Sequence, residues 1–390
     1  MKHRPTGGAR LLIATAVLFL IAGGPSIFAA RPALAAGSTA LGSACVPPTK
    51  MDGTPAKTAW RLWVAATCPV NQNHYPYVVW ENWLQQPQMY PANPVQGLIV
   101  PNAGQTTSAH LLGPSPLGIV NGLPTDPDTG CTIASNGQTI CEEVRENGAF
   151  EDYVSATGLW NRANQQQVAR QQVASGVPQI KFPKAAVEIK ADWIKLPSCD
   201  NPPAGVHIEQ IGSYCFALAG MHLISKLRDN WVWATFEAQN LTTNPNRCVV
   251  LGCFDPWGSS PPRTQGADTQ LTTQLSNLMT RANLAPEWRN YRLDGVQLHF
   301  VDAQGKPTLL GNSVIEGENA GVPLTQSSCI TCHQVSSINQ DGTDGISLLT
   351  SSPIGKPAPL PSHAWIHRDF VWSLGDACFN AAFQTCASPP

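Results

Sequence analysis

The sequence predicts an α+β fold in which antiparallel strands and long loops dominate over short helices. Apolar residues recur with a period of two at 187–193, and two further strand-like runs follow at 214–227 and 231–236. Helical periodicity is limited to the regions near 148–174 and 268–282. Since 34 prolines and 32 glycines interrupt the 390 residues, we expect long loops between these elements.

The composition indicates a folded chain with a sizeable core. Apolar residues make up 43% and charged residues only 13%, about half of the usual ~25%. Disordered chains have the opposite balance, so the composition excludes disorder. The formal net charge of -2 provides no basic footprint, and we expect no nucleic-acid partner.

Residues 1–36 are interpreted as a signal peptide. A positively charged start (Lys2, Arg4 and Arg10) precedes an apolar run at 11–23, and small residues suited to cleavage follow at 28–30 and 33–35. An uncleaved anchor is the alternative, but the apolar run is shorter than the ~20 residues that a bilayer requires. Cleavage removes four of the 24 basic residues and no acidic ones, leaving 20 minus 26, or -6. We therefore expect a periplasmic or secreted protein without a membrane segment after cleavage.

The elements are expected in the following order. Residues 37–145 are loop-rich with short strand ends, and 148–174 predict two helices divided near Gly158. The alternation at 187–193 predicts a strand with one buried and one solvated face. The runs at 214–227 and 231–236 are expected to be neighbouring antiparallel strands.

Beyond these strands the pattern predicts one more helix and one more strand. Asp268 is expected to cap a helix that has leucines on one face (Leu271, Leu275 and Leu278), and residues 296–301 predict a strand. No repeat of fixed period is visible. We therefore divide the mature chain into a β-rich domain at 37–295 and a loop-rich region with short helices at 296–390.

The segment Cys329-Ile330-Thr331-Cys332-His333 is a C-x-x-C-H motif, the attachment signature of c-type haem. Two thiols at this spacing bond to the two vinyl groups of one haem, and the adjacent imidazole can ligate the iron. We therefore expect one covalent haem c at Cys329 and Cys332, with His333 as the proximal ligand. A redox disulfide and a zinc site are the alternatives, but no second C-x-x-C and no thioredoxin-like context accompany the motif.

The other ten cysteines suggest structural disulfides in an exported chain. The simplest scheme joins neighbours in sequence: Cys45/Cys68, Cys131/Cys141, Cys199/Cys215, Cys248/Cys253 and Cys378/Cys386. Many other pairings of ten cysteines are formally possible.

The opposite side of the haem decides between electron transfer and catalysis. No methionine follows residue 279, so a histidine is the expected ligand. His222 is the first candidate, because it lies in an apolar strand, with Met221 on the other face and Leu218 on its own. His363 and His367 are downstream candidates that a helix would place on one face, whereas a hydrogen-bonded or surface position is the alternative for each histidine.

Other residues near this strand have two interpretations each, a role at the haem and a purely structural role. Trp231 and Trp233 could line the haem or pack in a sheet, and Glu237 could be a distal acid or a solvated strand end. Residues 311–316, just before the motif, predict a positioning turn without chemistry of its own.

Together these segments resemble a group of exported bacterial c-type cytochromes that have a single haem motif near the C-terminus and a large preceding domain. The resemblance lies in residues 187–193, 220–226, 231–237, 311–316, 328–333 and 369–374. It implies thioether bonds at Cys329 and Cys332 and ligation by His333. The group often has a histidine after the Phe-Glu of its tryptophan-rich strand, where this chain has Ala238, which favours His222 as the distal ligand.

The predicted function is one-electron transfer by an exported monohaem c-type cytochrome, with a redox partner protein or small-molecule substrate that the sequence does not identify. The alternative is a haem enzyme, similar to a peroxidase or an oxygenase, with an open distal site. A third class is a disulfide-stapled binding domain without haem.

Overall fold

The computed structural model describes residues 42–72, 75–90, 110–239, 241, 247–264, 269–345, 348 and 354–377. Contacts group residues 41–390 into one unit, and the description concerns this unit. The signal-peptide prediction for 1–36 and the Cys378/Cys386 pair lie outside the described residues. The α+β prediction is confirmed, because a mostly antiparallel sheet is accompanied by several short helices.

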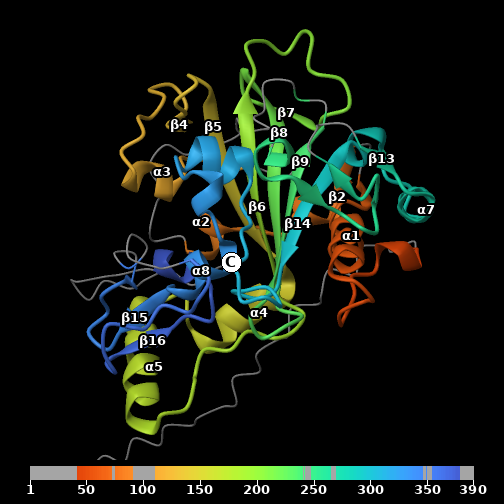
Figure 1. Cartoon of the computed structure of the whole chain (residues 1–390). Coiled ribbons are helices and arrows are strands. Elements are labelled where there is room, and N and C mark those ends of the chain that lie inside the picture. Colours follow the sequence, from red (N-terminus) through yellow and green to blue (C-terminus); the bar gives the residue numbers. More distant parts are fainter. Residues whose placement is uncertain are drawn as a thin grey trace, which may run out of the picture. The chain divides into compact units, whose positions relative to one another are not determined.

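The main sheet has eight strands in the order β14-β9-β8-β6-β5-β3, with β4 paired to β5 and β7 paired to β8, all antiparallel. Figure 1 shows its long strands side by side. Their bounds are β3 Leu84–Gln85, β4 Thr132–Ile133, β5 Thr139–Glu146, β6 Val187–Lys195, β7 Ile208–Ile211, β8 Tyr214–Ser225, β9 Val232–Ala238 and β14 Tyr291–Gln297. The prediction that 214–227 and 231–236 form neighbouring antiparallel strands is therefore confirmed.

Short helices and two-stranded ladders surround this sheet. The helices are α1 Pro55–Ala66, α2 Gln86–Met89, α3 Pro116–Val120, α4 Gly148–Thr157, α5 Arg162–Ser175, α6 Arg247–Leu251, α7 Thr273–Arg281 and α8 Cys329–Gln334. The 3₁₀ turns are η1 Ser43–Cys45, η2 Val79–Asn82, η3 Pro286–Arg289, η5 Leu324–Gln326 and η7 Ser373–Asp376, and η4 Ser313–Asn319 is a π-helix. The ladders pair β1 Pro69–Gln72 with β2 Tyr75–Val78, β10 Cys253–Phe254 with β12 Arg263–Thr264, β11 Ser259–Ser260 with β13 Gln270–Leu271, and β15 Ser337–Asn339 with β16 Trp365–His367.

One face of the sheet carries the larger apolar core. Helix α1 lies against it, with Trp60 and Trp63 fully buried and the Trp63 ring 4.4 Å from the ring of Phe236. Proline at the first turn and a Thr54 side chain that accepts a hydrogen bond from the Lys57 amide explain where this helix starts. The two predicted helices near 148–174 are also confirmed as α4 and α5, separated by Gly158 in the left-handed conformation.

The other face of the sheet is polar. The alternation predicts that this face is solvated, but in the structure it is buried. Glu188 and Asp192 are 6% and 0% exposed. The π-helix η4 contacts β5, β6 and β8 and covers this side. The alternating pattern shows which side chains are polar but not which are exposed to solvent. A polar face that another segment covers therefore has the same sequence pattern as a solvent-exposed face.

Two elements have bounds that differ from the sequence prediction. Helix α7 begins at Thr273, because the hydroxyl of Thr272 accepts a hydrogen bond from the amide of Leu275 at 3.2 Å, whereas Leu271 lies in β13. Asp268 lies outside the described residues. The last strand of the main sheet is β14, which ends at Gln297 and does not extend to 301.

A register shift in β8 corrects the expected surroundings of His222. Opposite the step from Asp192 to Trp193, the partner changes from Gly220 to Leu218. The extra residue reverses the alternation, so Leu218 lies on the face of Met221 and not on that of His222.

Four disulfides confirm four of the five predicted pairs: Cys45–Cys68, Cys131–Cys141, Cys199–Cys215 and Cys248–Cys253. Cys329 and Cys332 remain thiols. The ladder β15–β16 and helix α8 lie close together in Figure 1, where the C-terminal part of the chain gathers.

Candidate functional site

The C-x-x-C-H motif forms helix α8, and Gln297 at the end of β14 fixes its start. The Gln297 side chain accepts a hydrogen bond from the Ile330 amide at 2.9 Å and donates one to the Ser328 hydroxyl at 3.0 Å. Cys329 and Cys332 are three residues apart on this helix, so their side chains share one face. The two thiols are thus presented together from an anchored helical turn.

His333 is held in one tautomer by a backbone carbonyl. Its Nδ1 lies 2.9 Å from the carbonyl oxygen of Phe370. A carbonyl only accepts hydrogen bonds, so Nδ1 carries the proton and Nε2 keeps a lone pair. Burial lowers the pKa of His333 to about 4, so the imidazole is neutral at pH 7. The Trp233 ring packs against it, with the ring centroids 4.5 Å apart.

The carbonyl of Phe370 belongs to a turn with left-handed backbone conformation. Asp369 has φ 53° and Phe370 has φ 73°, values that are uncommon outside glycine. The Asp369 carboxylate accepts hydrogen bonds from the Lys226 ammonium at 2.5 Å and the Phe182 amide at 2.7 Å, and its carbonyl accepts one from Trp231 Nε1 at 2.8 Å. Two separate segments, the β8–β9 connection and the region of Phe182, therefore hold a strained turn in place, which is typical of functional sites.

Polar residues line the sheet face next to the motif. Lys190, His222 and Thr235 are cross-strand neighbours on β6, β8 and β9. Burial raises the pKa of the Cys332 thiol to about 12, and the carboxylate of Glu316 adds to this rise. Cys332 therefore stays protonated at neutral pH, unlike the nucleophilic thiolate of a redox C-x-x-C motif.

His222 is paired with Glu316, which η4 contributes. His222 Nε2 lies 2.9 and 3.1 Å from the two carboxylate oxygens of Glu316. Burial acts to raise the pKa of Glu316, but His222 and Lys190 outweigh it and hold the pKa at about 2. The other nitrogen of His222, Nδ1, is buried and has no hydrogen-bond partner among the described residues. One ring nitrogen is thus oriented by a carboxylate while the other remains for a further partner.

Local packing explains why Glu316 is in this position. The Asn312 side chain caps η4 by accepting hydrogen bonds from the amides of Val314 and Ile315, and it donates to the carbonyl of Phe236 at 3.0 Å. A Cβ at Gly220 would lie 2.6 Å from Asn312 Oδ1, so only glycine allows this approach. The π-helix that follows is a form found frequently at functional sites.

Of the two downstream candidate histidines, His367 contacts the last residue of α8, whereas His363 is exposed. The stretch with His363 and His367 is not a helix as expected, because β16 pairs with β15 there, and His367 Nε2 lies 3.2 Å from the Gln334 amide nitrogen. His299 and His363 are exposed. His222 remains the predicted distal ligand.

Two further sequence alternatives have clear placements. Trp231 and Trp233 are buried in a second apolar cluster that includes Ile330 of the motif. Glu237 is fully buried and is not a solvated strand end, because it forms an ion pair with Arg292 at 2.6 Å. The ordinary sequence interpretation of Glu237 was therefore wrong.

Sequence reasoning missed Glu316, Lys190 and the Phe370 carbonyl. The sequence predicts a turn without chemistry at 311–316, whereas in the structure Glu316 supplies the carboxylate that pairs with His222. Lys190 could have been found from its place in the polar alternation of β6, where it pairs with Glu142 at 2.7 Å. A backbone carbonyl has no sequence signal, because every residue has one.

The residues of this site fit a covalent c-type haem. Two thiols share a helical face, the next residue is an imidazole with a free Nε2 lone pair, and aromatic side chains surround it. Among the described residues, the clusters with metal-ligand spacing do not include Cys329, Cys332 or His333, which disfavours a zinc site here.

Comparison of the chain with protein-family models, with curated proteins and with solved structures finds no match in any of the three. Among the described helices, none combines the length and the apolar character needed to cross a membrane.

Proposed function

We propose that this chain is an exported monohaem c-type cytochrome that transfers single electrons. The observation that carries the proposal is His333: its Nδ1 proton is hydrogen-bonded to the Phe370 carbonyl, so its Nε2 lone pair is available on the residue that follows Cys332 in α8. Four disulfides support maturation outside the cytoplasm.

A haem bound at Cys329, Cys332 and His333 would supply one-electron redox chemistry. The chain's own residues would control its surroundings. The Trp233 ring packs on His333 and on the ring of Phe370, and the Phe370 carbonyl increases the basicity of the imidazole by accepting its Nδ1 proton in a hydrogen bond. Glu316 orients His222, the candidate distal ligand, and keeps a negative charge near the motif.

The pair of His222 and Glu316 also favours a second candidate, a haem enzyme with an open distal site. An imidazole backed by a carboxylate can move a proton to or from a small substrate. The two functions differ in what His222 does: in the carrier it ligates iron, and in the enzyme it stays free to exchange protons.

The first experiment tests attachment. The chain is expressed with its own leader in a host that has haem-attachment machinery, and its intact mass is measured after purification. We expect an increment of roughly 616 Da, lost in a Cys329→Ser, Cys332→Ser double variant and retained in His299→Ala. A colourless product of unmodified mass would refute the proposal.

The second experiment distinguishes carrier from enzyme. The optical spectrum of oxidised His222→Ala is compared with that of the wild type, with exposed His299→Ala as the control. The carrier requires a low-spin wild type and a high-spin His222→Ala variant. A high-spin wild type that binds cyanide rapidly would instead support the enzyme.

A further inference from the structure

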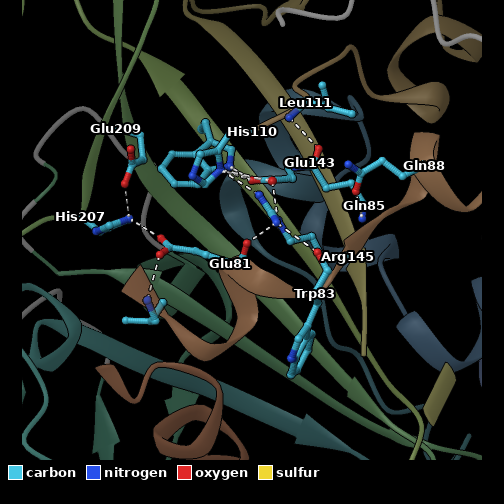
Figure 2. Close-up of polar contacts among 12 residues, drawn as sticks. Glu81, Trp83, Gln85, Gln88, His110, Leu111, Glu143, Arg145, His207 and Glu209 are labelled. Carbon is cyan, nitrogen blue, oxygen red and sulfur yellow. Dashed lines mark hydrogen bonds and ion pairs between the residues drawn. The ribbon is translucent and has the colours of Figure 1, made fainter. Parts of the chain in front are cut away.

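A second cluster of ligand-type side chains lies at the other face of the sheet. It consists of Glu81 in η2, His207 just before β7, and Glu209 in β7, which Figure 2 shows converging. His207 Nε2 is 2.9 Å from Glu81 Oε1 and 3.2 Å from Glu209 Oε1. One ligand atom from each residue lies within 4.8 Å of the others.

His207 and Glu81 form an ion pair whose hydrogen-bond geometry is poor. Glu81 and His207 are 1% and 7% exposed, yet Glu81 Oε1 and His207 Nε2 have no hydrogen-bond partner in the described part of the chain. The ring N–H direction therefore does not meet the carboxylate oxygen at 2.9 Å. Buried polar atoms in poor hydrogen-bond geometry are costly, and a cation in place of the ring proton would satisfy both atoms.

The separations match those between ligands of one metal ion. Nitrogen and oxygen ligands bind Zn²⁺ at about 2.0–2.1 Å, so two neighbouring ligands on the same ion lie about 2.8–3.0 Å apart in octahedral geometry and about 3.3–3.4 Å apart in tetrahedral geometry. The observed 2.9 and 3.2 Å agree with this spacing. One imidazole and two carboxylates also supply two negative charges for a divalent ion.

The surroundings hold these ligands in place and leave a path from solvent. The second oxygen of Glu81 accepts a hydrogen bond from the Val78 amide at 3.0 Å, which orients the carboxylate. The His207 ring packs on Trp288, with the ring centroids 4.3 Å apart. The side chain of Glu209 is 30% exposed, so an ion can reach the site from that side.

We propose that Glu81, His207 and Glu209 form a binding site for one divalent transition-metal ion, represented by Zn²⁺. The site is separate from the C-x-x-C-H motif, because it lies against the apolar core around Trp288. Metal binding at this site does not require haem attachment, so the proposal is independent of the proposed function.

The test uses the mature chain as purified, with or without haem, after treatment with a chelator. Isothermal titration with ZnCl₂ and elemental analysis, which counts zinc separately from iron, should both give one zinc per chain. We expect Glu209→Gln to weaken the affinity at least about 10-fold, because it replaces a charged ligand at the partly exposed position. Exposed Asp200→Asn is the matched control and should bind as the wild type does.

A measurement on the unaltered chain accompanies the variants. Zinc should raise the melting temperature of the wild type and of Asp200→Asn, and this rise should be absent in Glu209→Gln at the same zinc concentration. A wild type that takes up no zinc and shows no rise would overturn the proposal. So would a Glu209→Gln variant with wild-type affinity, because the zinc would then be held elsewhere.

Discussion

The buried carboxyl of Glu188 should make the protein less stable as the pH rises above about 5. In the register of β5 and β6, Glu188 lies directly opposite Glu146, and both are buried. Burial raises the pKa of Glu188 to about 7, against the opposing effects of the Ser373 hydroxyl and the Lys190 ammonium. The folded state therefore holds a proton that the unfolded chain releases at a lower pH.

The magnitude follows from this difference in pKa. The ordinary pKa of the glutamate is 4.5, and each pKa unit corresponds to about 1.4 kcal/mol. Raising the pKa to about 7 thus costs about 3 kcal/mol of folding free energy once the pH exceeds 7. Below pH 4.5 both states are protonated and the cost disappears, so it develops as the pH rises from 4.5 to 7.

The perturbation is Glu188→Gln, which keeps the shape of the side chain and removes its ionisation. The free energy of unfolding is measured by urea titration at pH 4.5 and at pH 8. At pH 8 we expect the variant to be more stable than the wild type by up to about 3 kcal/mol. At pH 4.5 the two should be nearly equal. Exposed Asp128→Asn is the control and should change little at either pH.

The comparison between the two pH values decides the outcome. A difference between Glu188→Gln and the wild type that is the same at pH 4.5 and pH 8 would refute the reasoning, because it would come from packing and not from the proton. A variant that is less stable than the wild type only at pH 8 would mean that the ionised carboxylate is stabilised in the fold.

Three other perturbations give sharp expectations. Asp369→Ala removes the carboxylate 2.5 Å from the buried Lys226 ammonium, so urea titration should show a loss of about 3 kcal/mol, and a loss near zero would contradict a tight ion pair. Burial acts to raise the pKa of Glu143, but Arg145 and His110 hold this pKa at about 2. The ionised Glu143 carboxylate therefore stabilises the folded protein fully above pH 4.5, and this contribution is lost as the pH falls towards 2. A Glu143→Gln variant should therefore show a smaller fall in melting temperature over that range, and an unchanged fall would be contrary evidence. Trp63→Ala should lower the unfolding free energy by about 3–5 kcal/mol in the same urea assay, since the ring is fully buried, and a loss under 1 kcal/mol would be inconsistent with that packing.

Local patterns predicted the strands and helices whose signals are contained within a few residues. The period of two placed β6, and the two runs after it became β8 and β9 with the expected pairing. The pattern could not reveal that η4 covers the polar face of β6, because that contact joins segments more than 100 residues apart. The sequence pattern also gave no sign of the extra residue in β8 opposite the step from Asp192 to Trp193. This residue moves Leu218 to the sheet face opposite that of His222.

The candidate site divides in the same way. The spacing of Cys329, Cys332 and His333 is a local signal, and it identifies the motif from the sequence alone. The carboxylate of Glu316 and the carbonyl of Phe370 reach the motif only through tertiary contacts, and neither residue type is distinctive in sequence. Sequence therefore predicts which atoms could bind a cofactor, whereas the fold determines their charge and tautomer.

The buried polar face next to the motif is difficult to explain by stability alone. Glu237 and Arg292 are nearly inaccessible to solvent and form an ion pair, and replacing such a buried pair by apolar residues of similar volume is often neutral or stabilising. The opposite face of the same sheet is built from large apolar side chains, so the fold itself does not require charge at these positions. Charges that are kept at a cost in stability and that lie where η4 covers the sheet are expected where a protein sets the electrostatic potential of a reactive group. The position of these charges, together with the C-x-x-C-H motif, therefore favours a redox centre here over a purely structural domain.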